Sequence, residues 1–443
     1  MTTRRDFVKS AGAAMVGAVG FPATAFTHTR PVDAPAGGAR PDGTTALATN
    51  GYLSSILPLA DRVALREINV RLTRLAIDQC EAGGGAANQV AFGTLICLAL
   101  ADLATHEVTE DDLLRLSRDF DVVFPWSLLY GNARTPFNFR LVRLPLIITF
   151  PRTVGDVVFW VNFVREHELS VSVRSGNNSY EGLSSTNDVV IDLTFLTLGQ
   201  QGARDAQFLI DEKSGVVHVA SGVRLGVLYT ALAERGLALA GGQCPSVCVG
   251  GLVGTGGVGF STREFGFACD QLTEVQCVLA DGSVVVANAG NQYGDLYRAA
   301  KGAGGAGLGI MTRLTMRVVP AVTVLFYVVA FDLKDGAVAL EAWQNLAATA
   351  PDALSSIVAA NASTAGLAGL IINGEYRVEH GDVEAAKQDL ATVLQTQWLD
   401  RLPPRVQHTP IVIEALTTLE AANAVALEVP MPVFNQWKLK SKF

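Results

Sequence analysis

The sequence predicts an α+β protein: two α+β subdomains, followed by an incomplete antiparallel sheet with helices on one face. Short apolar, β-branched segments alternate with helical patterns from Pro145 to Pro320 and include a hairpin at the turn Asp281-Gly282. A second set of strand and helix patterns begins at Val322. With 443 residues and 49% hydrophobic content, the chain can bury more than one core.

Residues 1–25 predict a twin-arginine export signal. Arg4-Arg5 precede an apolar stretch from Ala11 to Phe21 and the small residues Ala23-Thr24-Ala25. The apolar stretch is shorter than the ~20 residues of a membrane span, so we expect a periplasmic or extracellular protein without a membrane span. The alternative is a chance arginine pair before a core helix. Residues 26–50, rich in Pro, Gly, Ala and Thr, predict a flexible linker.

Residues 51–136 predict a helical N-terminal extension, whose simplest role is packing. Apolar residues recur at helical spacing over 59–77 and 90–104, and Thr109 precedes the acidic first turn of a third helix. Cys80 and Cys97 lie in or next to the first two helical patterns and could form a disulfide. Unpaired buried thiols are at least as good an alternative, for this pair and for Cys269 and Cys277.

Residues 137–320 predict the two α+β subdomains, and residues 321–443 predict the partial sheet. In the first region the expected strands cover 146–150, 171–173, 189–193, 215–220, 275–279 and 284–287, with a last strand ending at 319. The expected helices there cover 154–166, 225–235 and 291–300, with Thr153 capping the first. In the second region we expect strands over 323–331, 354–359 and 369–373, and helices over 336–349 and 382–394.

Two stretches carry the chemistry. One is Arg174-Ser-Gly-Asn-Asn-Ser-Tyr-Glu-Gly182, and the other is Cys244-Pro-Ser-Val-Cys-Val-Gly-Gly251, which continues to Gly256-Gly257-Val-Gly259. Each follows an apolar run, and its small residues let backbone N–H groups approach an anion such as a pyrophosphate closely. A cysteine within such a turn indicates a covalent partner; the alternative is an inert turn cysteine. Cys244 and Cys248 are too close together for us to expect a bridge between them.

The two stretches together resemble the berberine-bridge-enzyme-like FAD-linked oxidases of the p-cresol methylhydroxylase and vanillyl-alcohol oxidase superfamily. The resemblance implies a PCMH-type FAD-binding domain over 137–320 and the start of that family's substrate domain over 321–443. The segment Lys438-Leu-Lys-Ser-Lys-Phe443 is similar to one found inside that substrate domain, so we expect a chain truncated at its C-terminus.

The resemblance implies FAD as cofactor and assigns residues to it. The expected cofactor-binding residues are Arg174, Ser175, Gly176, Asn177, Asn178, Ser179, Gly182, Cys244, Val247, Val249, Gly250, Gly251, Gly256, Gly309 and Ile310. Cys244 matches a cysteine that bonds to carbon 6 of the flavin. Tyr180 matches a tyrosine close to flavin and substrate, with a packing aromatic as the alternative. We therefore expect Tyr180 and Cys244 at the catalytic centre.

This chain departs from the family pattern at several positions. Asn178 replaces the histidine that bonds to the flavin 8α methyl group, so no histidyl linkage is expected. Asn177 replaces a glycine, although asparagine tolerates left-handed backbone better than most residues. A small residue at the place of Val247 accompanies oxygen access in the family, and valine favours an oxidase. Glu375 and Tyr376 lie in the right domain for a catalytic base, but no pattern places them at the flavin.

The resulting expectation is an exported FAD-dependent oxidoreductase that oxidises a hydroxyl of a sugar or other small-molecule alcohol, with oxygen as acceptor. The alternatives are a flavin-binding remnant without catalysis and a dehydrogenase with another acceptor.

Other classes of function find little support. A net charge of −8 argues against a nucleic-acid surface. The six histidines show no metal-binding spacing, so no metal site is expected. Gly254-x-Gly256-x-x-Gly259 fits a dinucleotide fingerprint, but no helical pattern follows it.

Overall fold

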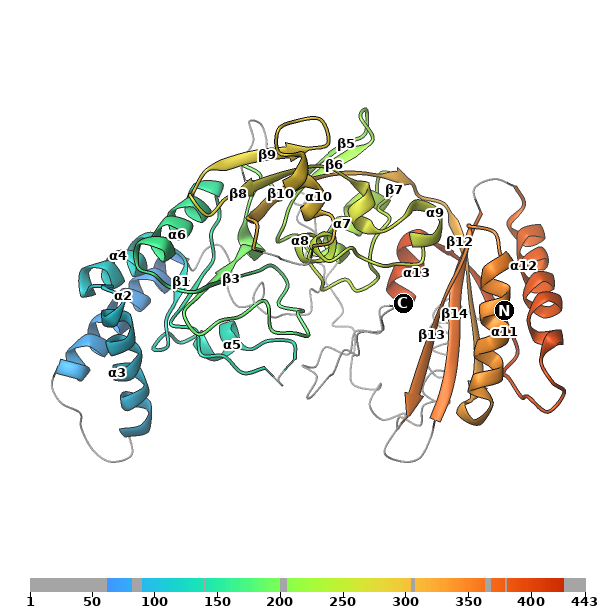
Figure 1. The fold of residues 1–443 in the computed structure, drawn as a ribbon, viewed down its shortest axis with the longest axis horizontal. Helices are drawn as coiled ribbons and strands as arrows, with labels where there is room; N and C mark the ends of the chain where they lie inside the picture. Colours follow the sequence, from blue (N-terminus) through green and yellow to red (C-terminus); the bar gives the residue numbers. More distant parts are fainter. Residues whose placement is uncertain are drawn as a thin grey trace, which may run out of the picture.

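The computed structural model describes residues 62–81, 90–138, 141–199, 205–303, 307–362, 368–378 and 381–425. Figure 1 shows a helical group at one end of the molecule, two subdomains in the middle, and a sheet with two long helices at the other end. The predicted signal over 1–25, the linker over 26–50 and the terminal segment 438–443 lie outside the described residues.

The N-terminal extension contains the three helices that the sequence predicts: α2 (Arg62–Glu81), α3 (Val90–Thr105) and α4 (Glu110–Asp119). Thr109 caps α4, since its hydroxyl accepts a hydrogen bond from the Asp112 backbone and the Asp112 carboxylate accepts one from the Thr109 backbone. Phe120, at the end of α4, stacks on Phe159 of the first subdomain with ring centroids 4.3 Å apart. The extension therefore packs against the first subdomain.

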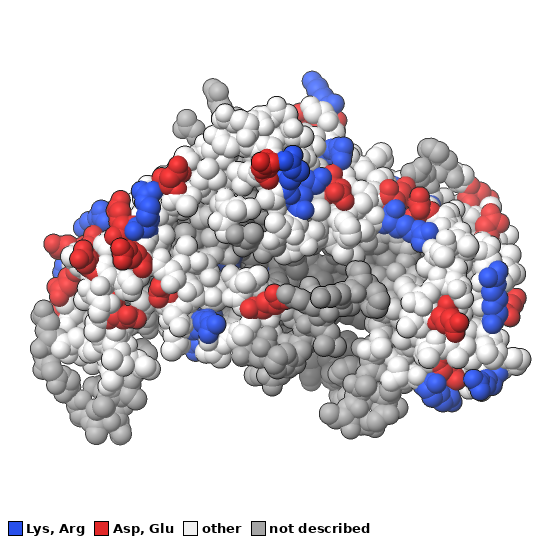
Figure 2. All heavy atoms as spheres, viewed as in Figure 1, with Lys and Arg blue, Asp and Glu red and all other residues white. Residues whose placement is uncertain are grey.

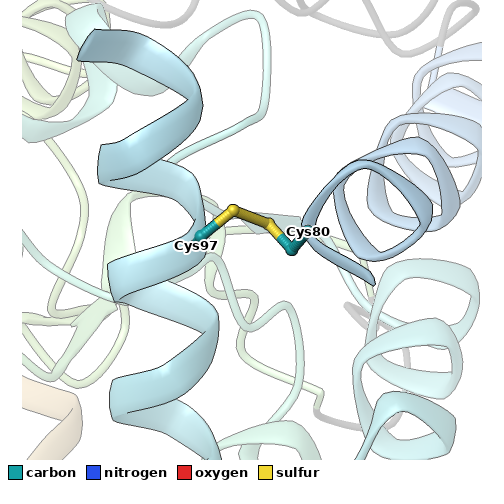
Figure 3. The surroundings of a disulfide bond; sticks show 2 residues. All are labelled: Cys80 and Cys97. Atoms are coloured by element: carbon teal, nitrogen blue, oxygen red, sulfur yellow. A yellow bond between two sulfur atoms is a disulfide. The ribbon is translucent and has the colours of Figure 1, made fainter. Parts of the chain in front are cut away.

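A disulfide joins the first two helices of the extension (Figure 3). Cys80 and Cys97 bond with their Cα atoms 5.5 Å apart, which confirms the pairing that the sequence allowed. Cys269 and Cys277 are instead buried free thiols, and Cys244 and Cys248 are also unbridged.

The first subdomain is a four-stranded sheet in the order β1-β2-β4-β3. Its strands are β1 (Val122–Val123), β2 (Ile147–Thr149), β3 (Val171–Arg174) and β4 (Val189–Asp192). Strands β2, β4 and β3 are parallel, and the predicted helix α6 (Val154–Glu166) connects β2 to β3. The carboxyl ends of β3 and β4 consequently lie side by side, which pairs Arg174 with Asp192 in register.

The second subdomain is a five-stranded antiparallel sheet in the order β5-β6-β10-β8-β9. Its strands are β5 (Phe208–Asp211), β6 (Val216–Ala220), β8 (Leu272–Val278), β9 (Val284–Asn288) and β10 (Ile310–Arg317). Helices α5 (Tyr130–Arg134), α7 (Leu225–Ala233), α8 (Val249–Gly254), α9 (Thr262–Phe265) and α10 (Gly294–Ala300) lie in the connections of the two subdomains, and β7 (Leu237–Ala238) pairs with β11 (Val319–Pro320). The hairpin β8–β9 confirms the turn signal, whereas β5 and the short helix α8 were not predicted.

The C-terminal unit is an antiparallel sheet in the order β13-β14-β12-β15. Its strands are β12 (Thr323–Asp332), β13 (Leu354–Ala362), β14 (Ala368–Val378) and β15 (Val412–Thr417), and its helices are α11 (Gly336–Thr349), α12 (Val383–Gln397) and α13 (Thr418–Val425). Alternate residues of β12 face opposite sides: Leu325 packs under α11 and α12, while Phe326 meets Phe260 of the second subdomain. Two helices thus cover one face, and the other face turns toward the second subdomain.

None of the described helices has both the length and the apolar composition of a membrane span. On the face shown in Figure 2, the lysine and arginine side chains lie beside aspartate and glutamate side chains rather than in one basic area.

Candidate functional site

The first predicted loop begins at a buried arginine. Arg174 ends β3 and donates from Nε to Asp192 Oδ2 at 2.6 Å, and from Nη2 to the Ala133 carbonyl at 2.7 Å. Its third nitrogen, Nη1, is buried and has no hydrogen-bond partner among the described residues. A buried unpaired donor of a charged group costs more than about 1 kcal/mol, so this position favours an acceptor from outside the chain.

Side-chain hydrogen bonds hold the loop that follows. Asn177 has the left-handed φ of 57° and donates to the Thr135 carbonyl at 2.7 Å. Asn178 donates to the Gly176 carbonyl at 2.9 Å, and Thr194 donates to the Ser175 carbonyl at 2.8 Å. Asparagine therefore does occupy left-handed backbone at the place of the family glycine, and the loop keeps an ordered path.

The second predicted turn leads into α8. The Val247 N–H donates to the Cys244 carbonyl at 3.2 Å, and the Leu225 N–H donates to the Val247 carbonyl at 2.9 Å. A Cβ at Gly250 would lie 2.6 Å from the Ser221 Cβ, so only glycine allows this approach. Cys244 itself is exposed.

The structure brings the two predicted loops together. A Cβ placed on Gly176 would lie 3.1 Å from the Cys248 backbone nitrogen, and one placed on Gly251 would lie 3.7 Å from Ser175 Oγ. Burial raises the pKa of Tyr180, and the nearby Cys244 thiol raises it further. Tyr180 and Cys244, the two residues expected at the catalytic centre, are therefore electrostatic neighbours.

The two cysteines of the turn have opposite environments. Cys248 is buried, its Sγ donates to the Gly222 carbonyl at 3.2 Å, and burial raises its pKa to about 12. A thiol with such a pKa stays protonated and unreactive at neutral pH. Only Cys244 presents its sulfur to solvent.

The remaining predicted residues lie around this junction. Ser179 Oγ accepts from the Leu183 N–H at 3.1 Å, and Gly182 and Gly256 have φ of 77° and 102°. Ile310 begins β10, and the next residue, Met311, accepts a hydrogen bond from Ser221 beneath Gly250. Gly309 is exposed with φ of 146°, and its close neighbours are on β8 and the β8–β9 turn rather than on either loop.

A pocket next to the Cys244 turn contains residues that the sequence did not assign to the site. Gln243, Glu375 and Tyr229 line it, with contributions from α13. Glu375 lies on the face of β14 that meets the second subdomain, whereas Tyr376 points to the opposite face and packs with the α11 and α12 core. Strand register decides this difference, and the sequence offered no signal for it.

The pair of loops has the chemistry of a dinucleotide cofactor site. An added Cβ at Gly256 would have no atom within 4 Å, one at Gly251 would meet Ser175 Oγ at 3.7 Å, and the unpaired Arg174 Nη1 offers a charged donor. Open backbone and a buried guanidinium suit a pyrophosphate. Within the described residues, no three histidine, cysteine, aspartate or glutamate side chains gather as metal ligands would.

Comparison with known proteins finds an FAD binding domain and FAD-linked relatives. Residues 145–288 match the FAD binding domain model. The chain is 30% identical over 233 residues to the uncharacterized FAD-linked oxidoreductase YgaK of Bacillus subtilis, covering 52% of this chain and 50% of YgaK. It is 33% identical over 239 residues to a carbohydrate oxidase of Microdochium nivale, covering 52% of this chain and 45% of that protein.

A solved structure agrees with these matches. The structure of Physcomitrella patens BBE-like 1 superposes with a TM-score of 0.60 at 27% identity, covering 75% of this chain and 66% of that one. Residues 145–288 therefore form an FAD binding domain, and the chain is similar to berberine-bridge-enzyme-like FAD-linked oxidoreductases. It spans about half the length of the curated relatives that it matches.

FAD is the cofactor of the matched domain. The Arg174 loop and the Cys244 turn are the residues that would hold it. When bound, FAD supplies a two-electron acceptor that the amino acids themselves lack.

Proposed function

We propose that this protein is an exported oxidoreductase that uses FAD to oxidise a hydroxyl group of a sugar or another alcohol and passes the electrons to oxygen. The observation that carries the proposal is the junction of the two loops, where the exposed Cys244 lies beside Tyr180. A relative at 33% identity is a carbohydrate oxidase, which supports an alcohol substrate. Valine at position 247 supports oxygen as the acceptor, because a small residue at this place accompanies oxygen access in the family that the chain resembles.

The proposal assigns separate tasks to the residues of the junction. The Arg174 loop and the glycines after Cys244 bind the cofactor phosphates, while Cys244 anchors the flavin ring through its sulfur. Tyr180 keeps its hydroxyl proton at neutral pH, since the ordinary tyrosine pKa is already about 10 and burial raises it further. It can donate a hydrogen bond beside the flavin. Asn178 supplies no second covalent link, since an amide nitrogen is a poor nucleophile.

Export by the twin-arginine route is part of the same proposal. The Arg4-Arg5 pair and the apolar stretch after it support the route. The Cys80–Cys97 disulfide suits an oxidising compartment outside the cytoplasm. Replacing both arginines by lysine is expected to leave the protein in the cytoplasm, as cell fractionation with antibody detection would reveal.

The test of the chemistry uses the purified full chain. We expect a flavin absorption spectrum that bleaches when an alcohol substrate is added without oxygen and returns when oxygen is admitted. If a dye acceptor but not oxygen restores the bleached spectrum, the protein is a dehydrogenase rather than an oxidase. A folded, yellow protein that no member of a broad panel of sugars and alcohols bleaches would refute the enzymatic proposal and leave a flavin-binding protein.

A further inference from the structure

A second pocket, of about 60 Å³, lies where the N-terminal extension meets the first subdomain. Residues of α2 between 62 and 72 form one side, and residues 120–123, 127–129 and 150 form the other. We call it the extension pocket. None of the described residues that line it belongs to the Arg174 loop or to the Cys244 turn. The extension pocket is therefore separate from the candidate cofactor site.

Most of the lining of the extension pocket is apolar. Leu65, Ile68 and Leu72 lie on one face of α2, since their spacing follows the helical repeat. The opposite side adds further aliphatic and aromatic side chains. The two uncharged polar residues of the lining, Asn69 and Ser127, already bond to each other and to backbone groups. The lining thus suits an apolar chain, apart from the charged groups that it contains.

Three arginines share one carboxylate at this pocket. Asp121 accepts from Arg66 Nε at 2.9 Å and from Arg152 Nε at 2.7 Å, and Arg62 Nη1 lies 3.9 Å from it. Arg62 and Arg152 also lie over the same ring, that of Phe195, with their guanidinium carbons 5.3 and 5.4 Å from its centroid. Among the described residues, these guanidinium groups form ion pairs with Asp121 alone. Positive charge is therefore in surplus.

Two nitrogens of this arginine cluster lack acceptors. Arg62 Nε and Arg152 Nη2 are buried, and neither donates to a described atom. The carboxylate of Asp156 is occupied elsewhere, because it accepts from backbone N–H groups at the start of α6. Burial lowers the pKa of Arg62, Asp121 opposes this shift, and Arg66 adds to it. Since buried charged donors without acceptors are costly, the cluster favours a further anion.

The surplus charge borders the apolar lining. Arg62, Arg66 and Asp121 all line the extension pocket, and both guanidinium groups approach the same carboxylate. An anionic group in the pocket would consequently lie beside two arginines at once. A guanidinium group is a planar donor that matches the geometry of a carboxylate.

We propose that the extension pocket binds a small carboxylate with an apolar chain, of the chemical class of short fatty acids. The carboxylate pairs with Arg62 and Arg66, and the chain lies against the face of α2 that carries Ile68. A neutral alcohol leaves the surplus charge without a counter-ion, and an ammonium is repelled by it. An anion without a chain leaves the apolar lining in water. The inference is independent of the flavin chemistry.

Isothermal titration calorimetry on the purified full chain tests the pocket with hexanoate, hexan-1-ol, hexylammonium and acetate. At pH 7 we expect hexanoate to bind more tightly than the other three probes. Arg62→Gln should weaken hexanoate binding about tenfold or more, because a hydrogen bond between charged groups is stronger than a neutral one. Arg62→Lys keeps the charge and should recover most of the affinity.

Asp121→Asn gives a change of opposite sign. It should tighten hexanoate binding, because it removes the carboxylate that competes for the guanidinium groups, whereas a loss of structure would weaken binding. Arg71→Gln, at an exposed position of α2 outside the pocket, is the matched control and should leave binding unchanged. Circular dichroism and thermal unfolding verify that each variant is folded. Arg62→Lys and Asp121→Asn supply a result if Arg62→Gln fails to fold.

Several outcomes would overturn the inference. They are absence of hexanoate binding, equal binding of hexan-1-ol, hexylammonium or acetate, and an affinity for hexanoate that Arg62→Gln leaves unchanged. Binding that depends on Arg62 identifies the extension pocket rather than the candidate cofactor site. The flavin spectrum tests the proposed oxidation separately, so either proposal can fail without the other.

Discussion

Cys244 and Cys248 are separated by a single turn, yet their sulfur atoms have different chemistry. Cys248 lies against the Gly222 carbonyl in a fully buried site, while Cys244 is exposed beside Tyr180. The residue type is the same, so the difference comes from desolvation, which disfavours the thiolate of Cys248. The same effect acts on Glu375, whose pKa it raises to about 8. Burial at single positions thus sets which groups can react, bind or titrate.

The cysteine pair yields the first prediction. We expect acid precipitation of the wild type to leave flavin in the pellet, because Cys244 anchors it, and Cys244→Ala to release the flavin into the supernatant. Cys248→Ala is the matched control and should keep a yellow pellet, since its buried thiol has a pKa of about 12. The spectra of pellet and supernatant, with the mass of the Cys244 peptide, measure the outcome. A colourless wild-type pellet would show that FAD binds without this bond.

Glu375 yields the second prediction. Its pKa is about 8 in the folded protein and 4.5 for the unperturbed side chain, so between these values the folded state holds a proton that the unfolded state has lost. Stability therefore falls as pH rises from about 4.5 to about 8, by at most about 1.4 kcal/mol per pH unit.

Glu375→Gln should remove this component, so its stability relative to the wild type should increase with pH across that window. Urea unfolding at several pH values from 5 to 9 measures the difference, with the exposed Glu341→Gln as control. A difference between Glu375→Gln and wild type that stays constant with pH would contradict the prediction.

At the scale of elements, the Cys244 turn depends on close backbone contact. A Cβ at Gly259 would lie 1.7 Å from the Gly241 carbonyl oxygen, a separation that no side chain can occupy. Gly241 itself leaves no room beside the Tyr229 hydroxyl, with 2.7 Å to an added Cβ. Small residues in this stretch therefore let two segments of the turn cross, and they fix the path that leads to Cys244.

The third prediction follows from this crossing. Gly259→Ala should destabilise the protein by at least about 2 kcal/mol, because the crossing segments must move apart, and flavin content should fall with it. Gly131→Ala is the control: it lies in α5 with no atom near its Cβ position. It should be neutral or stabilising by up to about 1 kcal/mol. Chemical denaturation measures the stability of the two variants, and the flavin-to-protein absorbance ratio measures their flavin content. Equal stability of the two variants would refute the role of the crossing.

At the scale of the whole molecule, a few contacts join the second subdomain to the C-terminal sheet. Arg263 donates to the carbonyls of Ala347 and Ala350 at the end of α11, at 2.7 and 2.5 Å. Arg377 pairs with Glu264, and Phe260 meets Phe326. These contacts hold the face of the sheet that carries Glu375 against the Cys244 turn, so the pocket depends on them.

The fourth prediction concerns this junction. Arg377→Met removes one partner of a largely buried ion pair and should cost about 3 kcal/mol, measured by denaturant unfolding. Adding Glu264→Gln should recover part of the loss, since it removes the remaining carboxylate charge. Arg405→Met, on an exposed arginine of the same unit, is the control. If Arg377→Met and Arg405→Met lower the free energy of unfolding by the same amount, the ion pair does not join the units.

Much of the local structure follows from the sequence because its causes are local. The helices over 154–166 and 336–349 end where the patterns end, and Thr109 and Thr153 form the caps expected of them. Short elements were harder to predict from the sequence. The helix α8 lies within a glycine-rich turn, and the strand β5 forms its ladder with β6. Their existence depends on partners elsewhere in the chain, which no local pattern records.

By itself, the sequence indicated the family that the chain resembles, because the two motifs carry specific residues in a specific order and local backbone chemistry acts on each of them. It also determined which residues form the Arg174 loop and the Cys244 turn. Only the tertiary structure decided that Gly176 lies close to Cys248, that Cys80 bonds to Cys97, and that Glu375 rather than Tyr376 lines the same pocket as Gln243. These outcomes depend on strand register and packing between distant segments, and a one-residue change of register would have turned the other side chain toward the pocket.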